Sequence, residues 1–270
     1  MRKLALLLMI LAPGVLADGH HGAHAALNWS GALEGEHRSD ANRARDAHRH
    51  PRATLSFFGL KPDMTVLEVS PGGGWYTEVL APLLSGHGKL VAGHGSPNGS
   101  AYGRRSLGRY LQKLGENNEI YAGVDVRVMQ PPQAPLNVDP QSVDMALVFR
   151  NVHSWFRAGT ADAALADIYR ALKPGGTLGI VQHRAADGVT LDEMKRKAYV
   201  PESKVIALAE SAGFVLTDRS EINANAKDTK DYPRGVWTLP PSFTEGDKNR
   251  AKYAAIGESD RMTLRFTKPD

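Results

Sequence analysis

The chain has 270 residues, of which 42% are hydrophobic and 23% charged, which is ordinary for a globular protein with one large core. Its formal net charge of +4 is too small to indicate a nucleic-acid-binding protein. The sequence contains no cysteine, so we expect no lipid anchor on an acylated cysteine.

The first residues follow the pattern of a secretory signal peptide. Arg2 and Lys3 precede an apolar run over residues 4–11, and the stretch that ends at Ala17 suits cleavage there. The apolar run is too short for a stable membrane-spanning helix. We therefore expect residues 1–17 to be removed, which leaves a periplasmic or secreted protein without a stable membrane span.

Residues 18–40 are rich in glycine, alanine, histidine and serine and show no clear period. We expect a flexible, His-rich leader. His20, His21 and His24 could bind a metal, but no carboxylate or cysteine completes a closed site, so we expect at most weak metal scavenging and no dedicated metal site.

Residues 41–270 are expected to form a single domain that begins with two helices. Alanines at helical spacing predict a helix over 40–50 that Pro51 stops or kinks, and a second short helix over 52–60. Beyond them, strands alternate with helices. Strands are expected at 64–69, 89–92, 124–128, 143–149, 177–182, 214–217 and 262–266. Helices between them are expected at 75–84, 102–114, 161–172 and 204–212.

This alternation predicts an α/β fold with a doubly wound, mostly parallel, seven-stranded sheet and helices on both faces. No convincing helix separates the last two strands, so we expect the last strand to be antiparallel. The segment between them, residues 222–259, is long for a connection, and Pro233, Pro240 and Pro241 interrupt it. Long insertions are often functional, and we expect a lid over the binding site.

The first strand ends in an acid that is followed at once by glycines. Glu68 comes two residues before Ser70, and Gly72, Gly73 and Gly74 follow. Glycines let the backbone turn tightly and approach a ligand, and the helix beyond them offers unpaired N–H groups. The pattern indicates a nucleotide-sized pocket. Consecutive glycines do not match the Gly-x-Gly-x-x-Gly spacing of dinucleotide-binding sites.

Two further segments are expected at the same edge of the sheet. The fourth strand is followed by Arg150-Asn151-Val152-His153-Ser154-Trp155, and residues 172–178 place a Lys-Pro-Gly-Gly turn before the fifth strand. Ligands bind at the carboxyl ends of strands in such sheets, which favours a functional interpretation. A structural loop with a buried Trp155, and a simple helix C-cap at the glycines, are the alternatives.

At these three places the chain resembles the class I S-adenosylmethionine-dependent methyltransferases, over roughly residues 55–220 and the closing strand. Glu68 to Gly74 is similar to their first motif, with Ser70 in the place of the first glycine. More narrowly, three segments resemble a family of predicted bacterial methyltransferases that carry export signals. These segments are Glu-Val-Ser-Pro-Gly-Gly-Gly-Trp-Tyr-Thr-Glu, Phe-Arg-Asn-Val-His-Ser-Trp and Asp-Tyr-Pro-Arg-Gly-Val-Trp-Thr-Leu-Pro-Pro.

The resemblance implies S-adenosyl-L-methionine as the cofactor. The glycine loop would contact its methionine part and ribose, and Glu68 would fix the loop or the amino group. Where the family has an acid after the second strand, this chain has Ala-Gly-His-Gly-Ser, so His94 or Ser96 would bind the ribose. Asp125 belongs to the region near the adenine.

The resemblance also implies a small-molecule acceptor. His153 is the candidate general base because its ordinary pKa lies near neutrality, and Arg150 would hold an anionic group. Asn151 is expected in both the catalytic and the cofactor site. Trp155, Trp237 and Arg261 are expected to border the acceptor pocket. An exported, non-catalytic ligand-binding protein of the same fold is the alternative function, favoured by the missing acid and the export signal.

Overall fold

The computed structural model describes residues 26–270. The signal peptide expected at 1–17, and His20, His21 and His24, lie outside the described residues. Within the described range, no helix is long and apolar enough to cross a membrane. In the same range, no group of three or more histidine, aspartate or glutamate side chains is arranged to hold a metal ion.

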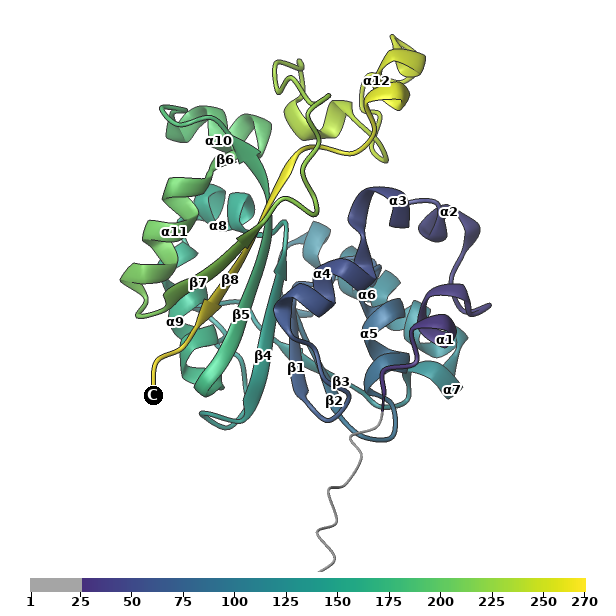
Figure 1. Cartoon of the computed structure of the whole chain (residues 1–270), viewed down its shortest axis with the longest axis vertical. Coiled ribbons are helices and arrows are strands. Elements are labelled where there is room, and N and C mark those ends of the chain that lie inside the picture. Colours follow the sequence, from purple (N-terminus) through teal and green to yellow (C-terminus); the bar gives the residue numbers. More distant parts are fainter. Residues whose placement is uncertain (1–25) are drawn as a thin grey trace, which may run out of the picture.

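The core of the molecule is a sheet in which the strands follow the order β3-β2-β1-β4-β5-β8-β7, with the short β6 paired to β5 (Figure 1). The strands are β1 (Thr65–Val69), β2 (Lys89–His94), β3 (Val124–Val128), β4 (Val143–Phe149), β5 (Leu172–Ala185), β6 (Val200–Pro201), β7 (Val215–Ser220) and β8 (Arg261–Thr267). Strands β1 to β5 pair in parallel, and β8 is antiparallel to both β5 and β7. The predicted fold class and the antiparallel last strand are therefore confirmed. The described sheet has eight strands rather than the expected seven, because the two-residue β6 is too short to give an apolar pattern.

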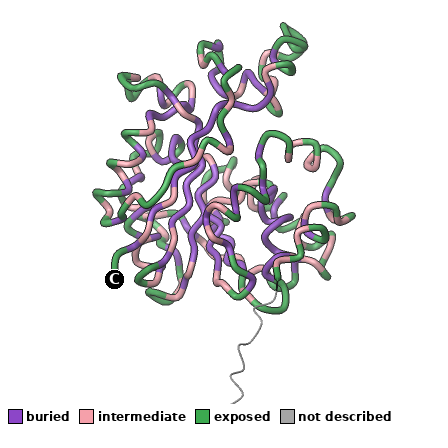
Figure 2. Tube along the Cα trace, viewed as in Figure 1, coloured by how far each residue is buried: buried purple, intermediate pink, exposed green. Residues whose placement is uncertain are grey.

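Helices cover both faces of this sheet (Figure 1). One face carries α4 (Pro51–Phe58), α5 (Thr77–Leu84), α6 (Ala101–Glu116) and α7 (Asn118–Tyr121), which pack with one apolar cluster. The other face carries α8 (Val152–Ala158), α9 (Ala161–Ala171) and α11 (Glu202–Ser211), which pack with a second cluster. Figure 2 shows the buried residues concentrated along the strands between these two layers.

The Lys-Pro-Gly-Gly turn is incorporated into β5 rather than separating a helix from a strand. Val143 pairs with Leu172 and Met145 pairs with Thr177, so the longer stretch of β5 bulges out against a short stretch of β4. Gly175 has a φ of +71°, a left-handed conformation that suits glycine at the bulge. The bulge lies at the end of the sheet opposite the strand carboxyl ends, so it takes no part in a site there.

The expectation of a flexible leader up to residue 40 is wrong for its described part from Trp29 onward. Helix α1 (Trp29–Glu34) packs on α5, with Ala32 fully buried. Arg38 is also buried, and its guanidinium donates two hydrogen bonds of 2.7 Å to the Asp46 carboxylate. A buried ion pair gives no apolar periodicity, which is why the sequence pattern did not reveal this packing.

The helix expected over 40–50 is broken in the middle. It consists of α2 (Asp40–Arg43) and α3 (Asp46–Arg49), and the chain then turns at His50, whose φ is +42°. Pro51 begins α4, where its missing N–H costs nothing. Arg45 and Arg49 of this segment line a cavity at the carboxyl ends of the strands.

The segment expected as a lid, residues 222–259, leaves β7 and returns into β8 (Figure 1). It contains η1 (Gly235–Thr238) and α12 (Arg250–Ile256), and α10 (Leu191–Lys197) contacts η1. Residues of this segment line a cavity at the carboxyl ends of the strands. The segment, called the lid segment below, therefore forms part of the cavity wall, and its closure over a ligand stays a prediction.

Candidate active site

Two strained residues mark the point at which the strand order reverses. Ser70 follows β1 with a φ of +48°, and Arg150 follows β4 with a φ of +65°. Both are left-handed conformations that non-glycine residues rarely adopt, and they persist where the surrounding structure imposes them. β1 and β4 are neighbours, so both residues lie at the position where doubly wound sheets bind ligands.

Asn151 fixes this junction. Its side-chain Nδ2 donates a hydrogen bond of 2.6 Å to the carbonyl of Val69, the last residue of β1. The bond ties the end of β1 to the start of α8, so the loop after each strand is held relative to the other.

The glycine loop is open on its outer side. A Cβ placed on Gly72 or on Gly73 meets no atom within 4 Å, and both residues line a cavity. Gly74 differs, because a Cβ there would meet Tyr110 and Lys113 of α6 at 3.1 Å. Gly74 allows α6 to pack closely, and it lines neither cavity described below, whereas it was expected beside Gly72 and Gly73 at the cofactor.

Two cavities meet above this loop. The first has a volume of about 380 Å³ and extends toward the lid segment. The second has a volume of about 580 Å³ and lies toward β2 and α6. Both are lined by the same group of residues: Ser70, Gly72, Tyr102, Asn151 and Ser154. Together the cavities offer a continuous space on both sides of the glycine loop.

The second cavity contains His94 at the end of β2. The backbone N–H of Gly95 donates to His94 Nδ1 at 2.8 Å, so the ring proton belongs on Nε2. Nε2 is buried and makes no hydrogen bond of good geometry within the described part of the chain. The backbone of Gly72 is near enough to favour the protonated ring. Burial lowers the pKa of His94, so the ring is neutral at pH 7 and can donate to a ligand oxygen.

Two residues expected at the site are placed differently. Trp155 lines the second cavity rather than the one under the lid. Asp125 forms ion pairs with Arg127 at 2.7 Å and Lys89 at 2.8 Å and lines neither cavity. Both misplacements arise because sequence position along a strand or helix does not determine which side faces a cavity.

Glu68 is only 2% exposed and lies at the floor of the first cavity. Thr77 Oγ1 donates a hydrogen bond of 2.6 Å to its carboxylate. Burial raises the pKa of Glu68 to about 7, although the bonds from Thr77 and the charge of Lys113 oppose this shift. The carboxyl group therefore changes protonation state near neutral pH.

His153 also lines the first cavity, close to Trp237 of the lid segment, with ring centroids 5.9 Å apart. Burial, together with the charges of Arg157 and Arg150, lowers the pKa of His153 to about 4. Gln182 Nε2 donates to the Ala198 carbonyl and faces His153 Nδ1 at 3.4 Å, which places the histidine proton on Nε2. His153 is therefore neutral at pH 7 and set to donate from Nε2.

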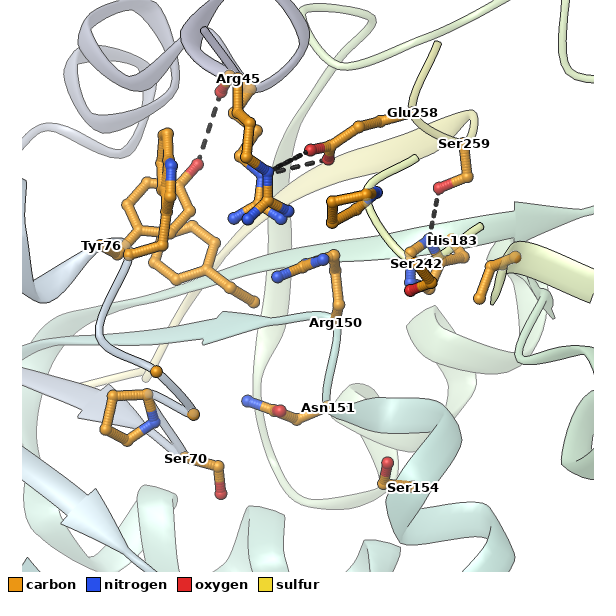
Figure 3. Close-up of a pocket in the computed structure, with 18 of the residues that line it drawn as sticks. Arg45, Ser70, Tyr76, Arg150, Asn151, Ser154, His183, Ser242, Glu258 and Ser259 are labelled. Carbon is orange, nitrogen blue, oxygen red and sulfur yellow. Dashed lines mark hydrogen bonds and ion pairs between the residues drawn. The ribbon is translucent and has the colours of Figure 1, made fainter. Parts of the chain in front are cut away.

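Sequence reasoning missed His183, which lies in β5. Its Nδ1 is 2.5 Å from Ser259 Oγ, and its ring centroid is 5.7 Å from that of His153 (Figure 3). Burial and the neighbouring His153 lower the pKa of His183 well below its usual range. A histidine inside a long apolar strand carries no sequence signal until the strand end is known to face a cavity.

The most highly charged part of the first cavity lies beneath the lid. Arg45 and Arg49, which the sequence did not single out, and Arg150 line it together with Glu258. Arg261 does not line it, contrary to expectation, because its guanidinium is engaged with Glu258 at 3.1 Å and with the His48 carbonyl at 2.7 Å. The only sequence feature that could have indicated that Arg45 and Arg49 act together was their spacing of four residues in a charged stretch.

Comparison with known proteins agrees with this architecture. Residues 67–180 match the methyltransferase domain family, and a comparison with curated proteins found no match. A SAM dependent methyltransferase from Aquifex aeolicus is 18% identical, with a TM-score of 0.56 over 83% of this chain and 93% of that chain. The [4+2]-cyclase SpnF is 16% identical, with a TM-score of 0.60 over 88% of this chain and 86% of that chain.

A third structure of the same fold was solved with ligands. It is a phosphoethanolamine N-methyltransferase from Haemonchus contortus in complex with phosphomonomethylethanolamine and S-adenosylhomocysteine. It is 16% identical, with a TM-score of 0.56 over 91% of this chain and 61% of that chain. At these identities the similarity establishes a common fold. The cyclase shows that one fold serves more than one reaction.

Proposed function

We propose that this chain, which carries a methyltransferase domain in the class I S-adenosylmethionine-dependent methyltransferase fold, transfers a methyl group from S-adenosyl-L-methionine to a small-molecule acceptor. The observation that carries the proposal is the open glycine loop between two connected cavities, at the point where the strand order reverses. The second cavity is available for the adenosine part of the cofactor. The first is available for its methionine part beside Glu68 and, toward the lid segment, for the acceptor.

The residues around the second cavity fit an adenosine-bearing ligand. The space above Gly72, which lines this cavity, is empty of protein atoms, and the buried Nε2 of His94 can donate to a ribose hydroxyl. His94 thus takes the place of the acid that the family has after its second strand. S-adenosylmethionine, when bound, supplies a methyl group that the positive charge on its sulfur already activates.

The chain's own residues then have to align the acceptor and exclude water. Asn151 holds the loops after β1 and β4 in register. Trp237 and other residues of the lid segment form part of the wall of the first cavity. His153 donates from Nε2 to orient the acceptor, and it can act as a base only in its other tautomer.

Replacing Gly73 with valine tests the cofactor site. A Cβ at Gly73 meets no protein atom within 4 Å, so valine there takes up part of the first cavity beside the loop. We expect the affinity for S-adenosylhomocysteine, measured by calorimetry, to fall by about 10-fold or more, because overpacking a site costs roughly 1–3 kcal/mol. Gly108→Val is the matched control, since a Cβ at Gly108 on α6 also meets no atom and lines neither cavity. Equal affinities in wild type and Gly73→Val, or no binding by wild type at millimolar concentration, contradict the proposal.

Ligand binding without catalysis is the second candidate function. It is favoured by the replacement of the acid after β2 with His94, which offers one donor where a carboxylate offers two acceptors. The two functions differ in one measurement. An enzyme transfers a labelled methyl group from S-adenosylmethionine to a component of a small-molecule extract, whereas a binding protein leaves the label on the cofactor.

We also propose that the protein is exported, as in the family of predicted bacterial methyltransferases that its motifs resemble. Cleavage after Ala17 makes Asp18 the first residue of the mature protein. N-terminal sequencing of the protein purified from the periplasm of a bacterial host should begin at Asp18. Recovery of the protein only from the cytosol, with its first residues intact, contradicts this proposal.

A further inference from the structure

An excess of positive charge surrounds one end of the first cavity. Four arginines lie there, and three of them, Arg45, Arg49 and Arg150, line the cavity. Among the described residues that line the cavity, the acids are Glu258 and Glu68, and burial raises the pKa of Glu68 to about 7. The cluster therefore has one firmly ionised carboxylate for four guanidinium groups.

Glu258 cannot neutralise this cluster. It accepts hydrogen bonds from Arg45 Nε at 2.7 Å, from Arg49 Nε at 3.1 Å and from Arg261 Nη1 at 3.1 Å. These cations lower the pKa of Glu258 to about 2 despite its burial. One negative charge is thus shared by three positive charges, and Arg150 adds a fourth.

Arg49 presents unused donors in this cluster. It is only 1% exposed, and Nη1 and Nη2 have no hydrogen-bond partner within residues 26–270. The ring of Trp75 covers one face of its guanidinium, with Cζ 4.6 Å from the ring centroid. Burial lowers the pKa of Arg49 well below its usual range, and Arg150 contributes to the shift. Buried hydrogen-bond donors without partners are energetically costly. A ligand atom that accepts hydrogen bonds from this guanidinium would remove that cost.

Arg150 faces the same space from the opposite side. Its left-handed backbone directs it out of β4, and in Figure 3 it lies between Asn151 and the pair formed by Arg45 and Glu258. In the part of the chain that the structure describes, its guanidinium makes no hydrogen bond within the usual distance. Burial lowers the pKa of Arg150 to about 10, so it is still charged at neutral pH.

We propose that Arg49 and Arg150, supported by Arg45, bind a carboxylate or phosphate group of the methyl acceptor. The proposal rests on the proposed function. Guanidinium groups bind the planar carboxylate and the tetrahedral phosphate with two parallel hydrogen bonds. An anion there balances the excess charge and engages the free nitrogens of Arg49. The acceptor is therefore a small anionic molecule.

The position of the cluster favours the acceptor over the cofactor as the source of the anion. The residues shared by both cavities, among them Ser70, Asn151 and Ser154, lie on one side of Arg150 in Figure 3, whereas Arg45 and Glu258 lie on the other. Ser242 of the lid segment also lines the first cavity. The carboxylate of the cofactor has the same chemistry, so the experiment must separate the two sources.

Calorimetry with inorganic phosphate as the probe makes this separation. Phosphate is titrated into the full-length protein alone, with saturating S-adenosylhomocysteine, and with saturating 5′-methylthioadenosine, which lacks the carboxylate. We expect phosphate to bind in all three conditions with affinities that agree within about twofold.

Two variants assign the binding to the arginines. Arg150→Gln removes the charge, and Arg49→Lys keeps a cation beside Glu258 but removes the unpaired nitrogens. We expect each to weaken phosphate binding by about 10-fold or more, because hydrogen bonds to charged groups are among the stronger ones. Arg109→Gln on α6 makes the same charge change at an exposed site outside both cavities and should leave phosphate binding unchanged.

The outcomes are distinguishable. Phosphate that is displaced by S-adenosylhomocysteine but not by 5′-methylthioadenosine shows that the site takes the cofactor's carboxylate, which overturns the inference. No phosphate binding by a protein that binds S-adenosylhomocysteine overturns it as well. Phosphate binding without any binding of S-adenosylhomocysteine overturns the proposed function, and the assignment to a methyl acceptor falls with it.

Discussion

Glu258→Gln should destabilise the protein by about 3–5 kcal/mol, because breaking a buried ion pair leaves the partner charges uncompensated. Glu258 is buried, and it accepts from Arg45, Arg49 and Arg261 at 2.7 to 3.1 Å. Glutamine retains the shape but not the charge, so the arginines that remain repel one another in a poorly solvated site. Urea unfolding at pH 7 measures the loss of the free energy of unfolding.

The control is Glu221→Gln. Glu221 also pairs with an arginine, Arg184 at 2.6 Å, but its side chain is 68% exposed. Exposed pairs contribute at most about 1 kcal/mol, so this variant should unfold almost like wild type. Similar losses in the two variants would mean that burial of the arginine cluster adds nothing to the strength of its ion pairs. The charge of Glu258 also makes stability sensitive to acid: its folded pKa of about 2 lies below the unfolded value, so its contribution is lost as the pH falls from about 4.5 toward 2.

Glu68→Gln should have the opposite effect and stabilise the protein at pH 8. The folded pKa of Glu68 is raised to about 7, so the folded state holds its proton more tightly than the unfolded state. Its stabilising contribution is therefore complete below the unfolded pKa and is lost as the pH rises through about 7. A shift of this size corresponds to roughly 3 kcal/mol, of which glutamine recovers most, since it needs no proton and can still accept from Thr77.

Urea unfolding of wild type and Glu68→Gln at pH 5 and pH 8 checks this expectation. The buried histidines titrate in both proteins, so the difference between the two isolates Glu68. The stability difference should be small at pH 5 and large at pH 8. A difference that does not change with pH would show that the Glu68 carboxyl group is not destabilised by burial. We also expect Glu68→Gln to weaken S-adenosylhomocysteine binding, because a carboxylate held at an energetic cost at the floor of the cavity is suited to a cationic amino group.

The sheet could be read from the sequence wherever an apolar run was bounded by turn residues. β3 and β4 begin and end at the predicted residues, Val124–Val128 and Val143–Phe149. β5 is longer than expected at both ends, because it begins with the bulged stretch from Leu172 against β4 and because the backbone of its last residues, up to Ala185, pairs with β8 and β6. Pairing of this kind is a tertiary effect that the local pattern does not contain.

Only the part of the candidate site that is formed by the short segments after β1 and β4 could be predicted from the sequence. Ser70, Gly72, Gly73, Asn151 and His153 all follow a strand directly, and the cavity gathers them. Arg49 was not predictable, because its segment has the charge density of a solvated helix and its partner Glu258 lies 209 positions away. Sequence patterns report what a segment prefers locally, whereas this arginine cluster is defined by distant parts of the chain that meet.

The contact between Arg45 and Glu258 joins two positions 213 residues apart across the mouth of the cavity. A chain that emerges from its N-terminus exposes Arg45 and Arg49 long before Glu258 exists, so the pocket is among the last regions to assemble. A bound anion then contacts arginines near the start of the domain in a cavity that is completed by residues near its end. Its presence should slow proteolysis in the segments around Arg45 and Glu258 together, because a ligand that binds only the folded state suppresses local opening of the parts that hold it.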